Sequence, residues 1–134
     1  MNRIKEKISE VEQFLDELCS VLPTNLDEYK ADFKIRSICE RHFEKIIEAV
    51  IDITFLVITK RELAFPEEDK KAFDVLGAAK IISPDLAQKL KEAKGMRNIL
   101  AHNYGKVNDN LVFEAVTERL NNDIRLFIES MKKL

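Results

Sequence analysis

Apolar residues recur at every third or fourth position over most of the chain, the spacing of one face of an α-helix. The first such stretch covers residues 2–21 and is ended by Pro23. A second stretch is expected to begin at a capping residue between Asn25 and Asp27 and to run to about Lys60. Its second half has apolar residues on nearly every side. We therefore expect it to be the central helix, enclosed by other helices or by a second subunit.

Three further helices are predicted in the second half of the chain. A shorter helix over about residues 67–79 follows a proline that breaks the preceding pattern. The next begins at Ser83, a capping residue followed by a proline in the first helical position, and Gly105 is a suitable stop. The last begins at Asn108 or the residue after it and carries apolar residues to Met131. The pattern predicts five helices: an up-and-down four-helix core with one shorter additional helix.

Length and composition favour a single all-α domain over residues 1–134. Three Gly and three Pro are too few for an all-β fold with many tight turns, and 46% hydrophobic residues can supply one core. No stretch of about 18 uncharged apolar residues suggests a membrane span, and the first residues lack the apolar run of a signal peptide. We therefore expect a cytoplasmic protein. Two cysteines without further cysteine or histidine residues at ligand spacing form neither a zinc site nor a disulfide framework. We therefore expect Cys19 and Cys39 to be small core residues.

Charge is distributed unevenly along the chain. The formal net charge of −2 excludes a protein whose whole surface is basic. Residues 88–106, however, contain five basic residues against one acidic residue, a net +4, which leaves −6 for the rest. One positive segment on an acidic body can focus a polyanion, although a solvated helix face also carries lysines.

The same segment contains four side chains suited to binding a phosphodiester and moving its protons. Arg97 offers a planar fork of donors that matches phosphate oxygens and stays charged at physiological pH. His102 titrates near neutrality and can accept or donate a proton. Asn98 can orient a neighbour, and Tyr104 adds a hydroxyl group. We interpret this cluster as the candidate site.

Helical geometry limits how these groups can cooperate. Asn98 and His102 are four residues apart and share one face, whereas Arg97 and His102 lie about 140° apart around an ideal helix. They can converge if the helix loosens near residues 103–105, if the long arginine side chain curls round, or if a second subunit completes the site. We prefer the third arrangement, a two-fold homodimer with the motif at its cleft, because the central helix is very apolar for a monomer surface.

The segment Arg97-Asn98-Ile99-Leu100-Ala101-His102-Asn103-Tyr104 resembles the Arg-x4-His signature of HEPN domains, in the Arg-Asn-x-x-x-His-x-Tyr form of HepT-like proteins. Residues 76–87 are similar to the stretch that precedes the motif helix in that family, and residues 47–53 to part of its long second helix. The five-helix layout extends the resemblance over essentially the whole chain. It implies a helical bundle of HEPN type.

The resemblance also implies an activity and a partner. HepT-like proteins are metal-independent endoribonucleases that act as toxins of type VII-like toxin–antitoxin pairs. On this basis Arg97 and His102 are the expected catalytic pair, Asn98 supports them, and no metal or cofactor is required. The expected antitoxin is a minimal nucleotidyltransferase of the MntA type, and Tyr104 matches the tyrosine to which such partners add AMP.

Five further residues extend the candidate site. Glu48 and Asp52 are four residues apart on the predicted central helix and can orient the catalytic pair, or else they form a polar stripe that pairs with a lysine. Lys94, Lys106 and Arg36 are candidates for RNA binding. The paired carboxylates alone are a weak signal for a metal site.

Two functions other than catalysis fit the same residues. The cleft can bind a nucleotide or an RNA end without any reaction, which salt-dependent binding of intact RNA would indicate. Alternatively, the chain is a scaffolding partner subunit of a nucleotidyltransferase, and the motif only builds the interface. The activity of purified variants distinguishes these alternatives.

Overall fold

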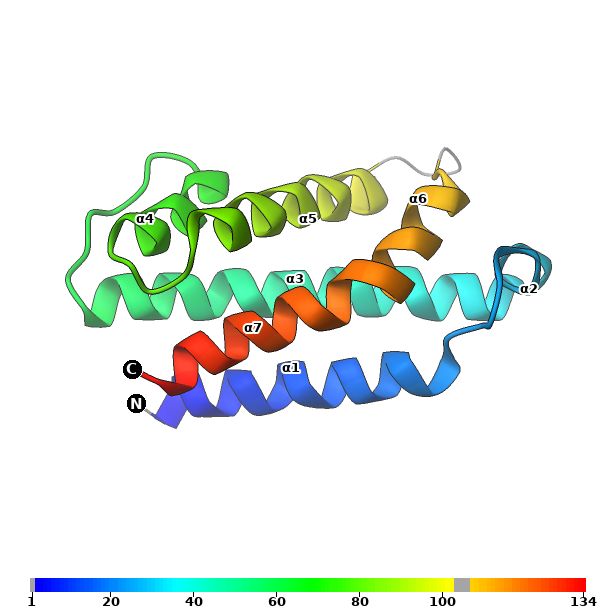
Figure 1. Cartoon of the computed structure of the whole chain (residues 1–134), viewed down its shortest axis with the longest axis horizontal. Coiled ribbons are helices and arrows are strands. Elements are labelled where there is room, and N and C mark those ends of the chain that lie inside the picture. Colours follow the sequence, from blue (N-terminus) through cyan, green and yellow to red (C-terminus); the bar gives the residue numbers. More distant parts are fainter. Residues whose placement is uncertain (1, 103–106) are drawn as a thin grey trace.

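A computed structural model describes residues 2–102 and 107–134, and in this part of the chain all regular elements are helical (Figure 1). Four long helices form the body of the molecule: α1 (Asn2–Val21), α3 (Phe33–Lys60), α5 (Pro84–His102) and α7 (Leu120–Lys132). Successive members of this set run in opposite directions, with α1 and α5 on either side of α3 and α7 crossing in front (Figure 1). The all-α class and the up-and-down core are confirmed.

The second predicted helix is divided, so the expectation of one continuous helix from about Asn25 to Lys60 was wrong. A short helix, α2 (Leu26–Ala31), precedes α3, and Asp32 between them is extended, with φ −118° and ψ 104°. The carboxylate of Asp32 accepts a hydrogen bond of 2.9 Å from the backbone N–H of Lys34, so this residue caps α3. An aspartate favours a helix start over a helix interior, and this preference decides the break.

The additional short helix is α4 (Ala72–Ala78), preceded by a single 3₁₀ turn at Asp69–Lys71. The predicted span of residues 67–79 was therefore too long at its beginning. α4 packs against α3 and α5 at the end of the bundle where α5 begins (Figure 1). After α4 the chain reverses direction at Lys80, whose φ of 62° lies in the left-handed region.

The last predicted helix is also interrupted. α6 (Asp109–Glu114) is followed by a π-helical segment, Ala115–Arg119, and then by α7. The hydroxyl of Thr117 donates to the backbone carbonyl of Phe113 at 2.6 Å. The same bond from Thr54 to Val50 leaves α3 regular, so the bond of Thr117 accompanies the widened turn without explaining it.

The core lies between the four long helices, and α3 contributes more of it than any other element. The largest fully buried side chains include Leu15 of α1, Phe43 and Ile53 of α3, Phe73 of α4 and Phe127 of α7. Each such side chain stabilises the fold by about 1.5–3 kcal/mol relative to an exposed position. Within the described residues, no helix is both long and apolar enough to cross a membrane.

The two cysteines differ in environment. Cys39 on α3 is buried, as predicted, and burial raises the pKa of its thiol to about 11. Cys19 on α1 is exposed, so the expectation of a core position was wrong for this residue. It lies on the outer face of α1, next to the buried Leu18 and beside the exposed Asn121.

Candidate active site

The helix α5 carries the motif and is continuous as far as His102. Its start is set by Ser83, whose hydroxyl accepts a hydrogen bond of 3.0 Å from the backbone N–H of Leu86. Its buried face includes Leu90 and Leu100, which anchor the helix against the core. The motif thus stands on a packed helix rather than on a loop, which gives its side chains defined directions.

Arg97 points from α5 toward α3 and is held by two neighbours. Its Nη2 lies 3.5 Å from Oε2 of Glu48, and its Nη1 donates to Oδ1 of Asn98 at 3.2 Å. The side chain is 26% exposed, and its Nε is buried without a hydrogen-bond partner. A buried donor without a partner is costly, and a phosphate oxygen would satisfy it. The guanidinium therefore combines a fixed position with unused capacity for an anion.

The two candidate carboxylates on α3 have different partners. Glu48 faces Arg97 of α5, whereas Oδ2 of Asp52 lies 3.4 Å from Nζ of Lys7 on α1. Although they are only one turn apart, they belong to different helix–helix contacts. The structure brings Glu48 to the motif and places Asp52 in an ion pair with a lysine.

His102 is the last residue of α5 and is exposed. None of the hydrogen bonds in the described parts of the chain involves its ring or joins it to Arg97. Because α5 stays helical throughout, the separation of about 140° between the two positions applies to this helix. Arg97 moreover bends toward Asn98 and Glu48. The route through the arginine side chain is thus not taken, and the route through a loosened helix near residues 103–105 lies outside the described residues.

Four residues of the predicted site remain, namely Arg36, Lys94, Tyr104 and Lys106. The guanidinium of Arg36 donates to the backbone carbonyl of Lys30 at the end of α2, which is a structural contact. Lys94 lies half-buried on α5, and among the ion pairs of residues 2–102 and 107–134 none involves it. Tyr104 and Lys106 lie outside the residues that the structure describes.

In the folded chain, acidic neighbours partly neutralise the basic residues of the segment 88–106. Lys89 pairs with Asp85 at 3.2 Å, and Lys91 pairs with Asp74 of α4 at 3.0 Å. With Arg97 held by Glu48, three of its basic residues thus have an acidic neighbour. A polyanion would therefore meet a mixed surface, in which local geometry matters more than net charge.

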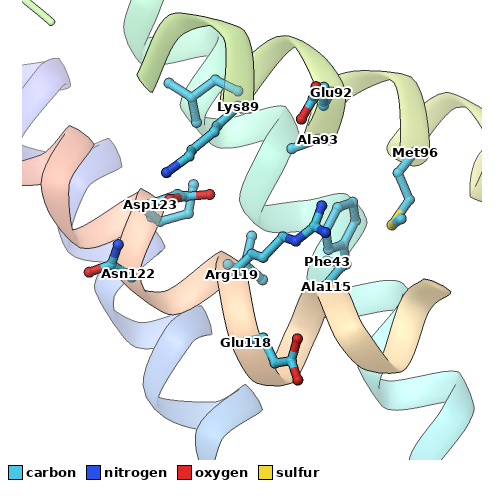
Figure 2. A pocket seen from close by; sticks show the side chains of 13 residues that line it. Phe43, Lys89, Glu92, Ala93, Met96, Ala115, Glu118, Arg119, Asn122 and Asp123 are labelled. Carbon is cyan, nitrogen blue, oxygen red and sulfur yellow. The ribbon is translucent and has the colours of Figure 1, made fainter. Parts of the chain in front are cut away.

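A cavity on another side of α5 was not foreseen from the sequence. It has a volume of about 410 Å³ and lies between α5, the π-helical segment and the start of α7, with Phe43 of α3 also lining it. Arg119 and Asp123 from the C-terminal part of the chain and Lys89 from α5 contribute polar groups (Figure 2). The only signal in the sequence is the polar cluster at residues 117–119, which has no motif spacing.

Comparison with known proteins gives a family match and several relatives for this chain. The profile of the family described as ribonuclease HepT-like matches residues 4–131. The tRNA nuclease HepT of Aphanizomenon flos-aquae is 31% identical over 114 residues, which are 85% of this chain and 78% of that protein. The mRNA nuclease HepT of Shewanella oneidensis is 29% identical over 105 residues, 78% of each chain.

A solved structure gives the same result at the level of the fold. The tri-AMPylated HEPN toxin of Shewanella oneidensis, in complex with an MNT antitoxin, has a TM-score of 0.89 and 26% identity, covering 98% of this chain and 97% of that one. The profile match, the relatives and the shared fold all extend over most of the chain. Together with the motif on α5, they show that this chain belongs to the ribonuclease HepT-like family of HEPN proteins.

Proposed function

We propose that this chain is an endoribonuclease toxin of a type VII-like toxin–antitoxin pair and that it cleaves RNA without a metal ion. The observation that carries the proposal is the state of Arg97. Its guanidinium is oriented by Glu48 and Asn98 and keeps a buried Nε without a partner, on the same helix as an exposed His102. The nuclease names of the HepT relatives support the same activity.

The chemistry needs only an acid–base group and a cation. The ribose 2′-hydroxyl attacks the adjacent phosphorus, a proton passes to a base, and the bond from phosphorus to the 5′-oxygen breaks as that oxygen takes up a proton. His102 is the proposed acid or base. Arg97 stabilises the negative charge that grows on the phosphorane oxygens. Asn98 keeps the guanidinium in place through the hydrogen bond to its Nη1.

We further propose that two copies form a homodimer that assembles each site. On α3, Glu48, Ile51, Asp52 and Phe55 follow one another at helical spacing and form a stripe that is exposed or half-buried. This stripe borders Arg97, so a second copy placed over it can bring its own motif helix to the same cleft. The 140° separation of Arg97 and His102 within one helix then ceases to be an obstacle.

Regulation follows from the position of Tyr104 two residues beyond His102. The proposed partner is an MntA-like minimal nucleotidyltransferase antitoxin that adds AMP to this tyrosine. The AMPylated toxin of Shewanella oneidensis, bound to its MNT antitoxin, supports this proposal. An added AMP brings a negative charge and bulk next to the cationic site, and both exclude a substrate phosphate.

RNA cleavage by purified variants tests the proposal. Arg97→Ala and His102→Ala should each abolish cleavage while the helical circular dichroism spectrum is retained. Arg125→Ala is the matched control, because Arg125 is exposed on α7 and pairs with Asp16 away from the motif. Normal cleavage by either motif variant would refute the catalytic assignment. Salt-dependent binding of RNA that stays intact would instead support the non-catalytic binding module.

A mass measurement tests the regulatory part separately. The chain co-expressed with a nucleotidyltransferase encoded beside it should gain one or more AMP units, and Tyr104→Phe should remove the gain at this residue. Unmodified protein after co-expression in the presence of ATP would refute the role of Tyr104.

A further inference from the structure

The cavity between α5 and the C-terminal segment has the construction of a ligand site. Its apolar walls come from three helices and the segment between them, and they include Phe43, Leu90, Ala93, Met96, Leu120 and Ile124. Its volume of about 410 Å³ lies in the range of small-molecule sites, which begins at about 300 Å³. An aromatic wall and a flexible methionine suit a flat ring that slides between two helices.

Polar side chains approach the cavity from two sides. Lys89 enters from the α5 side and Arg119 from the opposite wall, and Asp123 lies on the same side as Arg119 (Figure 2). Burial raises the pKa of Asp123, and the nearby charges of Lys89 and Arg119 counteract part of this rise. The two cations and the carboxylate of Asp123 thus act on one another, and Glu92 of α5 adds a second carboxylate to the lining. Glu118 also lines the cavity, but its carboxylate points away from it (Figure 2).

The existing partners of both cations are exchangeable. Lys89 pairs with Asp85 and Arg119 with Glu114, and all four side chains are substantially exposed. Exposed ion pairs of this kind contribute at most about 1 kcal/mol, so an incoming anion can replace them. An anion is therefore favoured by the placement of Lys89 and Arg119 on opposite walls and not by the net charge of the lining.

The π-helical segment is an independent sign of function at the same place. Arg119 is its last residue, and the segment includes a hydrogen bond from the hydroxyl of Thr117 to the carbonyl of Phe113. Widened turns within helices lower regularity and occur frequently at functional sites. Here the irregular turn ends in the one arginine of the cavity.

From these observations we propose that the cavity is a second site, separate from Arg97 and His102, that binds one nucleotide unit. The base lies between the apolar walls beside the half-buried Ala93 and Met96. The phosphate lies between Lys89 and Arg119. Asp123 accepts a hydrogen bond from the exocyclic amino group of adenine or cytosine. The unit is either a free nucleotide or one nucleotide of an RNA chain, since both have the same chemistry.

Binding to the full-length chain tests the proposal without relying on cleavage. The probes are AMP, CMP, UMP and a 2′-O-methylated adenosine–cytidine dinucleotide, which cannot be cut through a 2′-hydroxyl. Calorimetry gives the affinity, and the methyl NMR signal of Met96, which lines the cavity, gives the location. The methyl signal of Met131, on α7 away from the cavity, is the internal control.

The expected result is a shift of the Met96 signal with AMP, CMP or the dinucleotide and weaker binding of UMP, which lacks the amino group. Arg119→Gln and Lys89→Gln should each weaken binding about tenfold, since each removes one charged contact. The exposed control Arg125→Gln should bind as the parent chain does, and the shift of the Met96 signal should persist in the motif variant Arg97→Ala. Binding of free AMP or CMP assigns a free nucleotide, and binding of the dinucleotide alone assigns an RNA subsite.

Three outcomes would overturn the proposal. They are no binding of any probe at millimolar concentration, unchanged affinity in both Arg119→Gln and Lys89→Gln, and loss of the Met96 shift in Arg97→Ala. The last result would place the nucleotide at the motif and leave the proposed nuclease function untouched. Conversely, a nuclease test that fails does not affect the Met96 measurement, so the two proposals stand or fall separately.

Discussion

Glu48 and Asp52 are chemically similar, lie one turn apart on α3 and point out from the same side of that helix, yet they serve different contacts. Glu48 holds Arg97 of α5 at 3.5 Å, and Asp52 holds Lys7 of α1 at 3.4 Å. Both carboxylates are about half exposed, so burial does not separate them. What separates them is the helix that passes beside each one.

Under the proposed function, one end of this stripe of α3 serves the candidate site and the other end serves stability. The partner of Glu48 is an arginine that has a buried Nε without a hydrogen bond, which is a cost that a binding site can tolerate. The partner of Asp52 is an ordinary lysine that also approaches Glu10 within its own helix. We therefore expect substitutions at the Glu48 end to change activity and substitutions at the Asp52 end to change little.

The largest expected effect comes from exchanging the basic partners. Arg97→Lys should lower kcat/KM for RNA cleavage by about 100-fold, because an ammonium group cannot replace the planar fork on a phosphorane. Lys7→Arg, the matched exchange at the other end, should leave cleavage unchanged. Steady-state kinetics with a short fluorescent RNA measures both. Equal activity of Arg97→Lys and the parent chain would mean that only the positive charge is required.

A smaller effect is expected from the carboxylates themselves. Glu48→Gln should lower kcat about tenfold with little change in KM, because it loosens the orientation of Arg97 without removing it. Asp52→Asn is the isosteric control and should change kcat by less than about twofold. A rise of activity in Glu48→Gln would contradict a positioning role and show that Glu48 competes with the substrate phosphate.

Replacing Arg97 should affect the stability of the fold much less than the activity. Arg97→Ala should abolish cleavage but lower the free energy of unfolding by no more than about 1 kcal/mol, since its ion pair is partly exposed and its Nε makes no hydrogen bond. Urea denaturation of the purified variant measures this change. A loss of several kcal/mol would identify Arg97 as a structural residue of the α3–α5 contact.

The smallest effect is expected for the ion pair between α1 and α3. A double-mutant cycle with Lys7→Ala and Asp52→Asn should give a coupling energy of about 0.5 kcal/mol or less, and it should weaken further with added salt. Thermal denaturation of the four proteins at low and high salt provides the measurement. A coupling above 1 kcal/mol that resists salt would show that the two ends of the stripe are more alike than their exposure indicates.

The sequence predicted the fold well where regular periodicity was the signal. The spans of α1, α3, α5 and α7 agree with the predicted helices at most ends, because their apolar stripes and caps are local properties. The break at Asp32 was missed because its side-chain bond to the backbone outcompetes a helix whose apolar pattern continues through it. The π-helical segment Ala115–Arg119 was missed because the apolar pattern also continues through it. The exposed position of Cys19 was missed because a cysteine next to the buried Leu18 fits either face of a helix.

The candidate site could be found in part in the same way. The presence of Arg97, Asn98 and His102 on one helix follows from spacing alone, and so does the angle that keeps Arg97 and His102 apart. Spacing also placed Glu48 and Asp52 on one face, but it left open which of them meets the motif. The cavity with Lys89, Arg119 and Asp123 could not be predicted from the polar cluster at residues 117–119, because its members come from segments about thirty residues apart.

Local sequence thus determined which residues are helical, where most helices start, and which chemical groups α5 carries, because caps, propensity and periodicity act within a few neighbouring residues. Only the tertiary structure decided that Glu48 rather than Asp52 holds Arg97 and that Arg119 faces α5 across a cavity. These contacts depend on how α1, α5 and the C-terminal segment pack around α3. Such packing is set by side chains from all of these elements together, and no short stretch of sequence contains it.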